Sequence, residues 1–388
     1  MKPLNGVRVL EMARVLAGPW CGQILADLGA EVIKIERPGT GDDTRLWGPP
    51  FIFDAKGETW GAAYFHATNR GKKSVCVDFT TPEGQSVLNT LANQADVLVE
   101  NYKVGDLKRY GLDYKTLKKI NPRLIYASIT GFGQDGPYAN RAGYDFILQG
   151  MSGLMDITGE ADGQPQKVGV AVVDLFAGVY TSTAILAALH SRHTTGIGAH
   201  IDIALYDVAT SMLANQGMNY LASGKSPTRL GNAHPNIAPY QDFEVIDGFV
   251  IIAVGNDRQF QDLCEVLGAK TCADEPEFQT NASRVKSREL LTNALSPYLR
   301  KWTRLELLAA LEAKGVPAGP INRVEDVFDD PQIIHRGMCY ELVGDDGSVV
   351  KTIASPIVID SVRQTSDQAC PKLGSSSPKF TDDNQSTK

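Results

Sequence analysis

The sequence predicts an α/β protein with a doubly wound, Rossmann-like large domain and a smaller α+β domain. Short stretches rich in β-branched residues alternate with helical stretches as far as about residue 205, which is the pattern of a parallel sheet covered by helices on both faces. A loop-rich stretch at residues 222–227 ends this alternation, and a hairpin pattern followed by helices comes next. A chain of 388 residues is also long for a single hydrophobic core.

The large domain begins with a strand pattern at residues 4–12, followed by a helical stretch that ends near Gly29. A second strand at residues 30–36 ends in a turn, and the later elements are a helix at 82–95 and strands at 96–100, 124–129 and 200–204. No Gly-x-Gly-x-x-Gly motif follows the first strand, where the chain instead reads Leu-Ala-Gly-Pro-Trp at residues 16–20. A nicotinamide dinucleotide site is therefore not expected in the ordinary position.

Residues 225–321 are predicted to form the small domain, after a linker at 206–224 that separates it from the large-domain residues 1–205. Strand patterns at 241–245 and 249–254 flank the turn residues Asp247 and Gly248, which favours a hairpin. Helical stretches follow near residues 258–267, 287–301 and 304–314.

Composition narrows the class of function. The net charge of −7 disfavours nucleic acid as the main partner. The chain has no run of about 18 apolar residues, so no membrane span is expected, and its start lacks the apolar core of a signal peptide. The six cysteines show no metal-binding spacing. This pattern fits reduced thiols in the cytoplasm and predicts no metal site.

Asp174 is the residue that local pattern singles out. It follows small and β-branched residues at 168–173 and precedes a largely apolar run to Leu189, so we place it at or next to a helix N-terminus. Unpaired amides and the helix dipole should keep its carboxylate ionised there. A desolvated, ionised carboxylate can attack an activated acyl group, but an Asp in this place also serves simply as a helix cap.

Basic residues form two local clusters in this acidic chain. They are Arg70, Lys72 and Lys73, and then Lys103, Lys108 and Arg109. Each cluster is either a solvated surface or a cradle for phosphate groups, which guanidinium and ammonium groups bind well.

A series of motifs resembles the family III CoA-transferases, the carnitine and bile-acid CoA-transferase family. The motifs are residues 14–19, 28–38, 41–45, 69–74, 99–102, 126–133, 143–145, Asp174, 231–235 and 315–320, in order across residues 4–374. The resemblance implies an interlocked homodimer, CoA and acyl-CoA as substrates, and no permanently bound cofactor. It also implies that residues 322–388 return to the large, CoA-binding domain. The polar, Ser-rich tail from Gly374 is expected to fray.

By this resemblance Asp174 is the catalytic nucleophile. Its carboxylate attacks the thioester of a donor acyl-CoA, which gives a mixed anhydride and CoA thiolate, and the thiolate then forms an aspartyl-CoA thioester. An acceptor carboxylate reverses these steps. Tyr144 is expected to orient the carboxylate substrate, and the loop with Gly231, Asn232 and His234 is expected to act as a lid.

The family's contacts with CoA fall on nine positions of this chain: Leu16, Ala17, Arg37, Val77, Thr80, Asn101, Tyr102, Lys103 and Arg109. Arg37 directly follows a strand, where a guanidinium is well placed for phosphate. Its alternative role is a strand-end ion pair with Glu36 or Asp42.

Two other functions are compatible with the fold but less well supported by the residues. The α-methylacyl-CoA racemases share this fold and the aspartate but carry Gly-His-Asp where this chain has Gly143-Tyr144-Asp145, and a phenol with a pKa near ~10 is a poor partner for α-proton transfer. A CoA-binding module without catalysis is disfavoured by Asp174. The resemblance is strongest to members that use dicarboxylates, whose second carboxylate needs a cation such as Arg14, Arg45 or Arg141.

Overall fold

The computed structural model describes residues 2–381, which form two compact units. The first unit contains the chain up to Ser152, Val168–Met212 and the chain from Pro331 onward. The second contains Gly153–Lys167 and Leu213–Asp330. Residues 153–167 and 322–330, both expected in the large domain, thus belong to the second unit. The expected linker 206–224 is divided between α7 (Leu205–Ser211) in the first unit and α8 (Ala214–Ser223) in the second.

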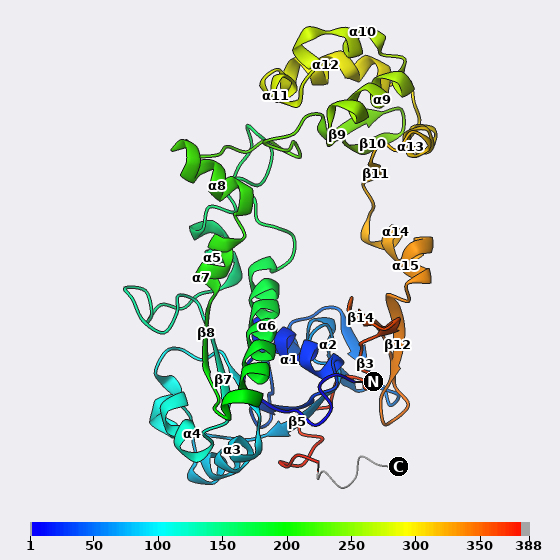
Figure 1. Ribbon diagram of the computed structural model, residues 1–388. Coiled ribbons are helices and arrows are strands. Elements are labelled where there is room, and N and C mark those ends of the chain that lie inside the picture. The colour runs from blue at the N-terminus through cyan, green and yellow to red at the C-terminus, as the bar shows by residue number, and fades with distance from the viewer. Residues whose placement is uncertain (1, 382–388) are drawn as a thin grey trace. The chain divides into compact units, whose positions relative to one another are not determined.

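A six-stranded parallel sheet is the centre of the first unit (Figure 1). In order across the sheet, its strands are β5 (Lys72–Cys76), β2 (Glu31–Glu36), β1 (Arg8–Glu11), β6 (Val97–Glu100), β7 (Ile125–Thr130) and β8 (His200–Ala204). Every neighbouring pair is parallel. If these six strands are numbered by their order in the chain, their order across the sheet is 3-2-1-4-5-6, which is the order of the doubly wound fold. The strand order reverses between β1 and β6. The predicted parallel α/β architecture is confirmed.

Helices cover both faces because successive strand residues point to opposite sides. On one face, α1 (Ala17–Asp27) and α6 (Val172–Thr195) bury Val9, Ile125 and Ala127. On the other, α3 (Pro82–Gln94) and α4 (Tyr114–Ile120) bury Leu10, Leu98 and Tyr126. Figure 1 shows α1 next to α6 and α3 next to α4.

Among the described residues one helix, α6, is long and apolar enough to cross a membrane by length and composition. It nevertheless packs into the first unit, where Val173, Ala177 and Ile185 are fully buried. A Cβ atom at Gly178 would lie 2.7 Å from the carbonyl oxygen of Ala17, so α6 and α1 approach closely at this glycine. We therefore assign α6 as a core helix of the doubly wound unit.

Strand β5 was not predicted, because its first two residues are lysines. Ion pairs, two of them buried, explain how a basic segment forms the strand at this edge of the sheet. The pairs are Arg70 with Asp27 (2.6 Å), Lys72 with Glu11 (2.8 Å) and Lys73 with Glu31 (2.5 Å). For Arg70 and Lys72, which are buried, the interpretation as a phosphate cradle or as a solvated surface was therefore wrong, whereas Lys73 is partly exposed.

Smaller elements complete the first unit. They are β3 (Phe51–Phe53), β4 (Thr59–Ala62), α2 (Ala63–His66), α5 (Asp145–Met151), α15 (Pro331–His335), β12 (Cys339–Val343), β13 (Val349–Ile353), β14 (Val358–Ile359) and β15 (Val362–Arg363). The segment 374–381, expected to fray, is held instead: Ser376 N–H donates to Ser74 O (2.9 Å), and Phe380 is buried. The rest of the expected frayed tail lies outside the described residues.

The second unit has its own core around an antiparallel sheet. Strands β9 (Tyr240–Val245) and β10 (Gly248–Ala253) form the predicted hairpin, and β11 (Ala318–Pro320) pairs with β10. The helices are α8, α9 (Asp257–Leu267), α10 (Lys270–Asp274), α11 (Asn281–Lys286), α12 (Arg288–Leu299), α13 (Arg304–Ala313) and α14 (Val324–Asp329). Phe243, Val250, Phe260, Leu295 and Leu307 form part of this core.

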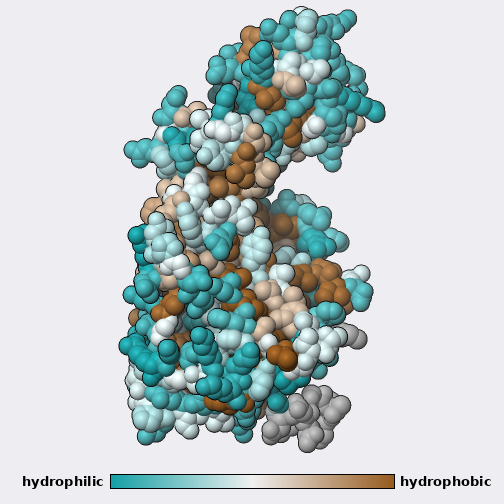
Figure 2. Space-filling view, turned by 60° about the vertical axis from the view of Figure 1, so that its left-hand side comes forward, coloured by the Kyte–Doolittle hydropathy of each residue, from teal (hydrophilic) through white to brown (hydrophobic). Residues whose placement is uncertain are grey.

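Large apolar side chains are exposed on two helices of the first unit. On α5 and α6 they are Phe146, Ile147, Met151, Phe176, Val179, Tyr180 and Leu186. The spacing of the α6 residues places them along one stripe of the helix. Figure 2 shows several hydrophobic areas open on the face that it presents. Such exposed apolar surface is typical of interaction sites.

Candidate active site

The carboxyl ends of β1 and β6 are the point where the strand order reverses, and open α/β sheets bind their ligands in the crevice there. A cavity of about 360 Å³ lies at this place, entirely within the first unit. The segment after β1 and the segment after β6 line it, and so do Tyr144 and Asp174. Five predicted CoA contacts also line it: Leu16, Ala17, Asn101, Tyr102 and Lys103.

The loop after β1 is held in a strained conformation. Val15 has φ 69°, which is left-handed backbone that a β-branched residue rarely adopts. The Asp42 carboxylate accepts the Val15 N–H (3.2 Å). The Asn101 side chain accepts the Arg14 N–H (2.9 Å) and donates to the Arg14 carbonyl oxygen (2.7 Å). Asn101 thus joins the two segments across the strand reversal and fixes the backbone that leads to Leu16.

A buried cation stabilises this arrangement from inside the sheet. Lys34 Nζ lies 2.9 Å from the Asp42 carboxylate and 3.0 Å from that of Glu11, and it donates to Ala13 O (2.8 Å). Burial alone would raise the pKa of Asp42, but the Lys34 ammonium and the hydrogen bonds from Thr44 outweigh it and hold the pKa at about 2. Asp42 therefore stays ionised and keeps its bond to the loop at any ordinary pH.

Asp174 lies in the first turn of α6, as predicted, but it is not the residue that caps the helix. That role belongs to Asp145, the first residue of α5, whose carboxylate accepts the Val173 N–H (2.7 Å) and, more distantly, the Asp174 N–H (3.4 Å). Gln149 Nε2 donates to the other oxygen of Asp145 (2.6 Å). The Asp174 carboxylate is left free for chemistry, half-buried at the cavity wall.

The expectation that Asp174 stays fully ionised was wrong. Burial, and then the neighbouring Asp145 carboxylate, raise the pKa of Asp174 from its ordinary 3.8 to about 7. The helix dipole favours the anion, but desolvation and a like charge together outweigh that effect. Asp174 therefore titrates near neutral pH instead of being fully ionised there, and deprotonation must precede any nucleophilic attack.

A second cavity of about 400 Å³ adjoins the first, because Arg14 and Tyr102 line both. The Arg14 guanidinium lies 5.5 Å from the centre of the Tyr102 ring. Three further predicted CoA contacts line the second cavity, namely Arg37, Val77 and Thr80. The structure thus brings eight of the nine positions into two neighbouring cavities.

Arg37 is exposed, and within residues 2–381 it forms no ion pair. The two carboxylates proposed as its alternative partners are already taken: Arg45 binds Glu36 (2.7 Å) and Lys34 binds Asp42 (2.9 Å). The strand-end ion pair is therefore not found, and the Arg37 guanidinium is available to a ligand of the second cavity.

A family model described as CoA-transferase family III matches residues 4–377. A succinate–glutarate CoA-transferase from Agrobacterium fabrum is 54% identical over 372 residues, covering 96% of this chain and 93% of that protein. An acetyl-CoA:oxalate CoA-transferase from Acetobacter aceti is 41% identical over 343 residues, covering 88% of this chain and 86% of that protein. The solved structure of a CAIB/BAIF family protein from Brucella suis is 56% identical, has a TM-score of 0.85 and covers 96% of both chains.

The chain belongs to CoA-transferase family III. It is an enzyme of this CoA-transferase type, as the resemblance implied. Within the described residues no three His, Cys, Asp or Glu side chains come together as a metal site.

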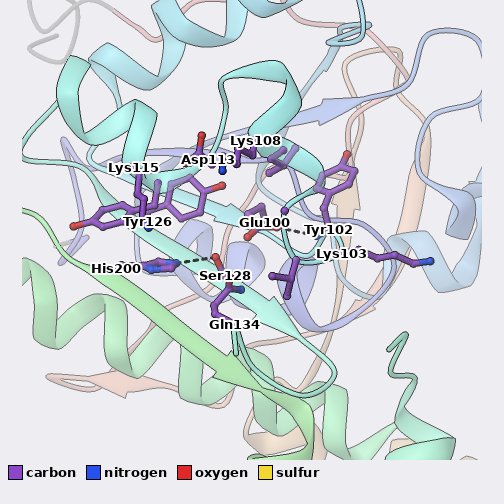
Figure 3. Close-up of a pocket in the computed structure, with 14 residues that line it drawn as sticks. Glu100, Tyr102, Lys103, Lys108, Asp113, Lys115, Tyr126, Ser128, Gln134 and His200 are labelled. Atoms are coloured by element: carbon purple, nitrogen blue, oxygen red, sulfur yellow. Dashed lines mark hydrogen bonds between the residues drawn. The ribbon is translucent and has the colours of Figure 1, made fainter. Parts of the chain in front are cut away.

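A third cavity of this CoA-transferase has a volume of about 230 Å³ (Figure 3). Its lining includes the two lysines of the second basic cluster. Lys103 and Lys108 line it, and Lys103 also lines the cavity of Asp174. Arg109 lines none of the three cavities. Its guanidinium lies over the Tyr110 ring and 3.6 Å from the Asp106 carboxylate. A CoA contact by Arg109 stays a prediction.

Glu100 of the transferase, at the end of β6, lines the third cavity and was not among the predicted site residues. Burial raises its pKa to about 7, although Ser128 and the Tyr102 N–H (2.8 Å) lower it in part. Figure 3 shows Glu100 near Ser128, whose hydroxyl is bonded to His200 Nε2 (3.0 Å). The sequence places Glu100 in a strand and in motif 99–102 but does not reveal its raised pKa, because that shift arises only when the sheet and its covering helices assemble.

The predicted lid residues Gly231, Asn232 and His234 lie in the second unit of the transferase. Gly231 N–H donates to Gly159 O (3.1 Å), and Asn232 Nδ2 donates to the Asp242 carboxylate (3.1 Å). His234 Nδ1 accepts the Asn236 N–H (3.1 Å). These bonds order the loop within its own unit. Its closing over Asp174 stays a prediction.

Proposed function

We propose that this enzyme moves CoA from an acyl-CoA donor to a dicarboxylic acid acceptor, with Asp174 as the covalent nucleophile. The observation that carries the proposal is the position of Asp174. Its free carboxylate shares a cavity with predicted CoA contacts at the strand reversal of a CoA-transferase family III fold. The names of two relatives supply the substrate class, because succinate, glutarate and oxalate all carry two carboxylates.

The reaction begins when ionised Asp174 attacks the thioester carbonyl carbon of the donor. The C–S bond breaks, CoA leaves as a thiolate, and a mixed anhydride of Asp174 and the acyl group remains. The thiolate then attacks the Asp174 carbonyl carbon, which releases the donor acid as a carboxylate and leaves an aspartyl-CoA thioester. The acceptor carboxylate attacks this thioester, and the same steps in reverse give the new acyl-CoA and free Asp174.

The chain's own groups suit these steps. The raised pKa of Asp174, about 7, makes its carboxylate more basic than an ordinary aspartate and therefore a stronger nucleophile once ionised. The first amides of α1 have no partner within the helix. One of them belongs to Ala17, which lines the cavity, so this helix end favours the negative charge of CoA or of a reacting oxygen.

CoA is proposed to extend across the two adjoining cavities. Its phosphates and adenosine would contact Arg37, Val77 and Thr80 in the second cavity, and its thioester would reach Asp174 in the first. Tyr144 is largely exposed in the first cavity and would orient the carboxylate of the acyl group or acceptor. No histidine lines this cavity, which removes the usual acid/base partner for racemisation.

A homodimer in the cytoplasm completes the proposal. The exposed apolar stripe of α6, with Phe176, Val179, Tyr180 and Leu186, supports an interface on this helix. The interlocked arrangement is proposed from the family resemblance alone.

The test of the nucleophile uses two variants, Asp174→Ala and the nearly isosteric Asp174→Asn. Both should lose CoA transfer completely, because the other two carboxylates that line the cavity, Asp43 and Asp106, lie at ion-pair distance from Arg14 and Arg109. Incubating the wild-type enzyme with succinyl-CoA and then hydroxylamine should convert Asp174 to a hydroxamate, detected by peptide mass spectrometry. Turnover by either variant above trace contamination, or absence of the hydroxamate under turnover conditions, would refute the assignment.

A further inference from the structure

Three arginines were candidates for binding the second carboxylate of a dicarboxylate, and their contacts in the folded chain separate them. Arg45 is buried, donates twice to Glu36 (both 2.7 Å) and lies 3.7 Å from the centre of the Phe65 ring. It does not line the cavity of Asp174. Because the Arg45 guanidinium is already paired with the Glu36 carboxylate, it is not available to bind a carboxylate of the substrate.

Arg14 lines the cavity, but its charge is also matched. Its guanidinium donates to the Asp43 carboxylate (3.1 Å), and its backbone is fixed by Asn101. Moving this side chain to a substrate would leave Asp43 without its cation. Arg14 is therefore suited to hold the shape of the wall that the two adjoining cavities share.

Arg141 differs from both. It lines the cavity of Asp174, is exposed, and within residues 2–381 no carboxylate lies at ion-pair distance from it. Its guanidinium lies 3.9 Å from the centre of the Tyr138 ring. Stacking on an aromatic ring orients a guanidinium without using its N–H donors. The full fork of donors therefore remains for a carboxylate.

The position of Arg141 is tied to the position of Asp174. The two ends of its loop meet where Gly131 and Gly143 touch: a Cβ atom on Gly131 would lie 2.6 Å from the Gly143 Cα. Soon after Gly143 the chain reaches Asp145, which binds the backbone N–H of Asp174 (3.4 Å). The cation and the nucleophile are thus held by one short, anchored stretch of chain.

Two aromatic contacts stabilise the same loop. Tyr138 meets Phe132 edge-on with ring centres 5.5 Å apart, and Phe132 meets Tyr206 of α7 at 5.7 Å. This packing fixes the ring on which the guanidinium rests, so little side-chain freedom is left to lose on binding.

We propose that Arg141 is the specificity-determining residue for dicarboxylates: its guanidinium binds the carboxylate at the far end of the acyl group or acceptor while Asp174 reacts at the near end. The inference rests on the proposed function, because it takes Asp174 as the reacting group. A monocarboxylate of the same chain length fills the same space but leaves Arg141 without an anion. The enzyme therefore favours dicarboxylates through one charge-assisted, two-pronged contact.

The experiment measures kcat/KM for two acceptors, glutarate and pentanoate, with succinyl-CoA as donor and mass spectrometry as readout. Arg141→Gln should lower kcat/KM for glutarate roughly 10- to 100-fold, the range of a lost charge-assisted hydrogen-bonded pair. It should change kcat/KM for pentanoate less than about twofold, since pentanoate makes no contact that the variant removes. Arg141→Lys should recover part of the glutarate rate, because it restores the charge but not the fork.

Two further variants make the result specific. Tyr138→Leu keeps Arg141 but removes the ring on which its guanidinium stacks. It should lower kcat/KM for glutarate less than Arg141→Gln does and should leave kcat/KM for pentanoate unchanged. Arg258→Gln is the matched control, because Arg258 is an exposed arginine of α9 in the second unit. Arg258→Gln should leave kcat/KM for both acceptors unchanged.

The outcomes separate this inference from the proposed function. If Arg141→Gln lowers kcat/KM equally for glutarate and pentanoate, or lowers it for neither, while the Asp174 hydroxamate still forms, the inference is overturned and the proposed function stands. The inference would also be overturned if Arg14→Gln lowered kcat/KM for glutarate alone and Arg141→Gln did not. Failure of the hydroxamate trap in the wild-type enzyme would instead overturn the proposed function.

Discussion

Replacing Asp145 by Asn should lower the pH at which Asp174 becomes active. Asp145 and Asp174 lie at the start of α5 and α6, and the Asp145 carboxylate accepts the backbone N–H of Val173 (2.7 Å). An Asn side chain keeps an oxygen for that bond but removes the negative charge. The repulsion that disfavours the ionised form of Asp174 then disappears, so its pKa should fall.

The structure bounds the size of the change. The pKa of Asp174 rises from 3.8 to about 7, and burial is the larger of its two causes. Asp145 therefore accounts for less than half of the rise, so the pKa should fall by less than about 1.5 pH units, or roughly 2 kcal/mol at 1.36 kcal/mol per unit. Burial remains in the variant, so its pKa should stay above the ordinary 3.8.

The assay follows acylation of Asp174 by succinyl-CoA in single turnovers between about pH 5 and 9. Wild-type rates should increase with pH around a midpoint near 7, because only the ionised carboxylate attacks. The Asp145→Asn midpoint should lie lower. Gln149→Met is the matched control, since it removes the hydrogen bond to Asp145 (2.6 Å) but keeps the charge, and its midpoint should not fall.

An Asp145→Asn midpoint equal to or above the wild-type value would refute the claim that the Asp145 charge raises the pKa of Asp174. A wild-type rate that is independent of pH from 5 to 9 would refute the wider claim that ionisation of Asp174 limits the attack. Near-UV circular dichroism of each variant checks that the fold is retained.

Three further predictions concern stability, CoA binding and the reaction class. Folded Asp174 holds its proton between pH 3.8 and about 7, where Asp174 of the unfolded chain has lost it, so the free energy of unfolding falls as pH rises through that window. Asp174→Asn should therefore have a higher free energy of unfolding than wild type at pH 8, by on the order of 1 to 3 kcal/mol, but not at pH 4. An equal difference at both pH values, measured by denaturant unfolding, would contradict this. Arg37→Ala should raise KM for the acyl-CoA with a smaller loss of kcat, whereas an unchanged KM would exclude Arg37 from the CoA site. Tyr144→Phe should lose only the ~1 to 3 kcal/mol of one hydrogen bond, and the wild-type enzyme should not exchange deuterium into the α-position of a 2-methylacyl-CoA; rapid exchange without acceptor would indicate racemase chemistry.

The sequence by itself determined the architecture and the position of the nucleophile along the chain. Alternating strand and helix patterns predicted the parallel sheet, and small residues followed by an apolar run placed Asp174 at the start of a helix, where α6 begins at Val172. These features depend on residues close together in the sequence, whose side-chain period and helix-starting preferences are local properties. The ordered family motifs then supplied the chemistry expected of Asp174.

Only the tertiary structure decided how the charged groups behave, because their surroundings come from distant parts of the chain. Asp145 meets the start of α6 across 28 residues, and Asn101 holds Arg14 across 87. Lys72 belongs to a basic cluster in the sequence, yet it is buried against Glu11 in the folded chain. Desolvation and ion pairing depend on what packs around a group rather than on its neighbours in sequence. For that reason the sequence named three arginines, and only the packed structure left Arg141 without a carboxylate partner among the described residues.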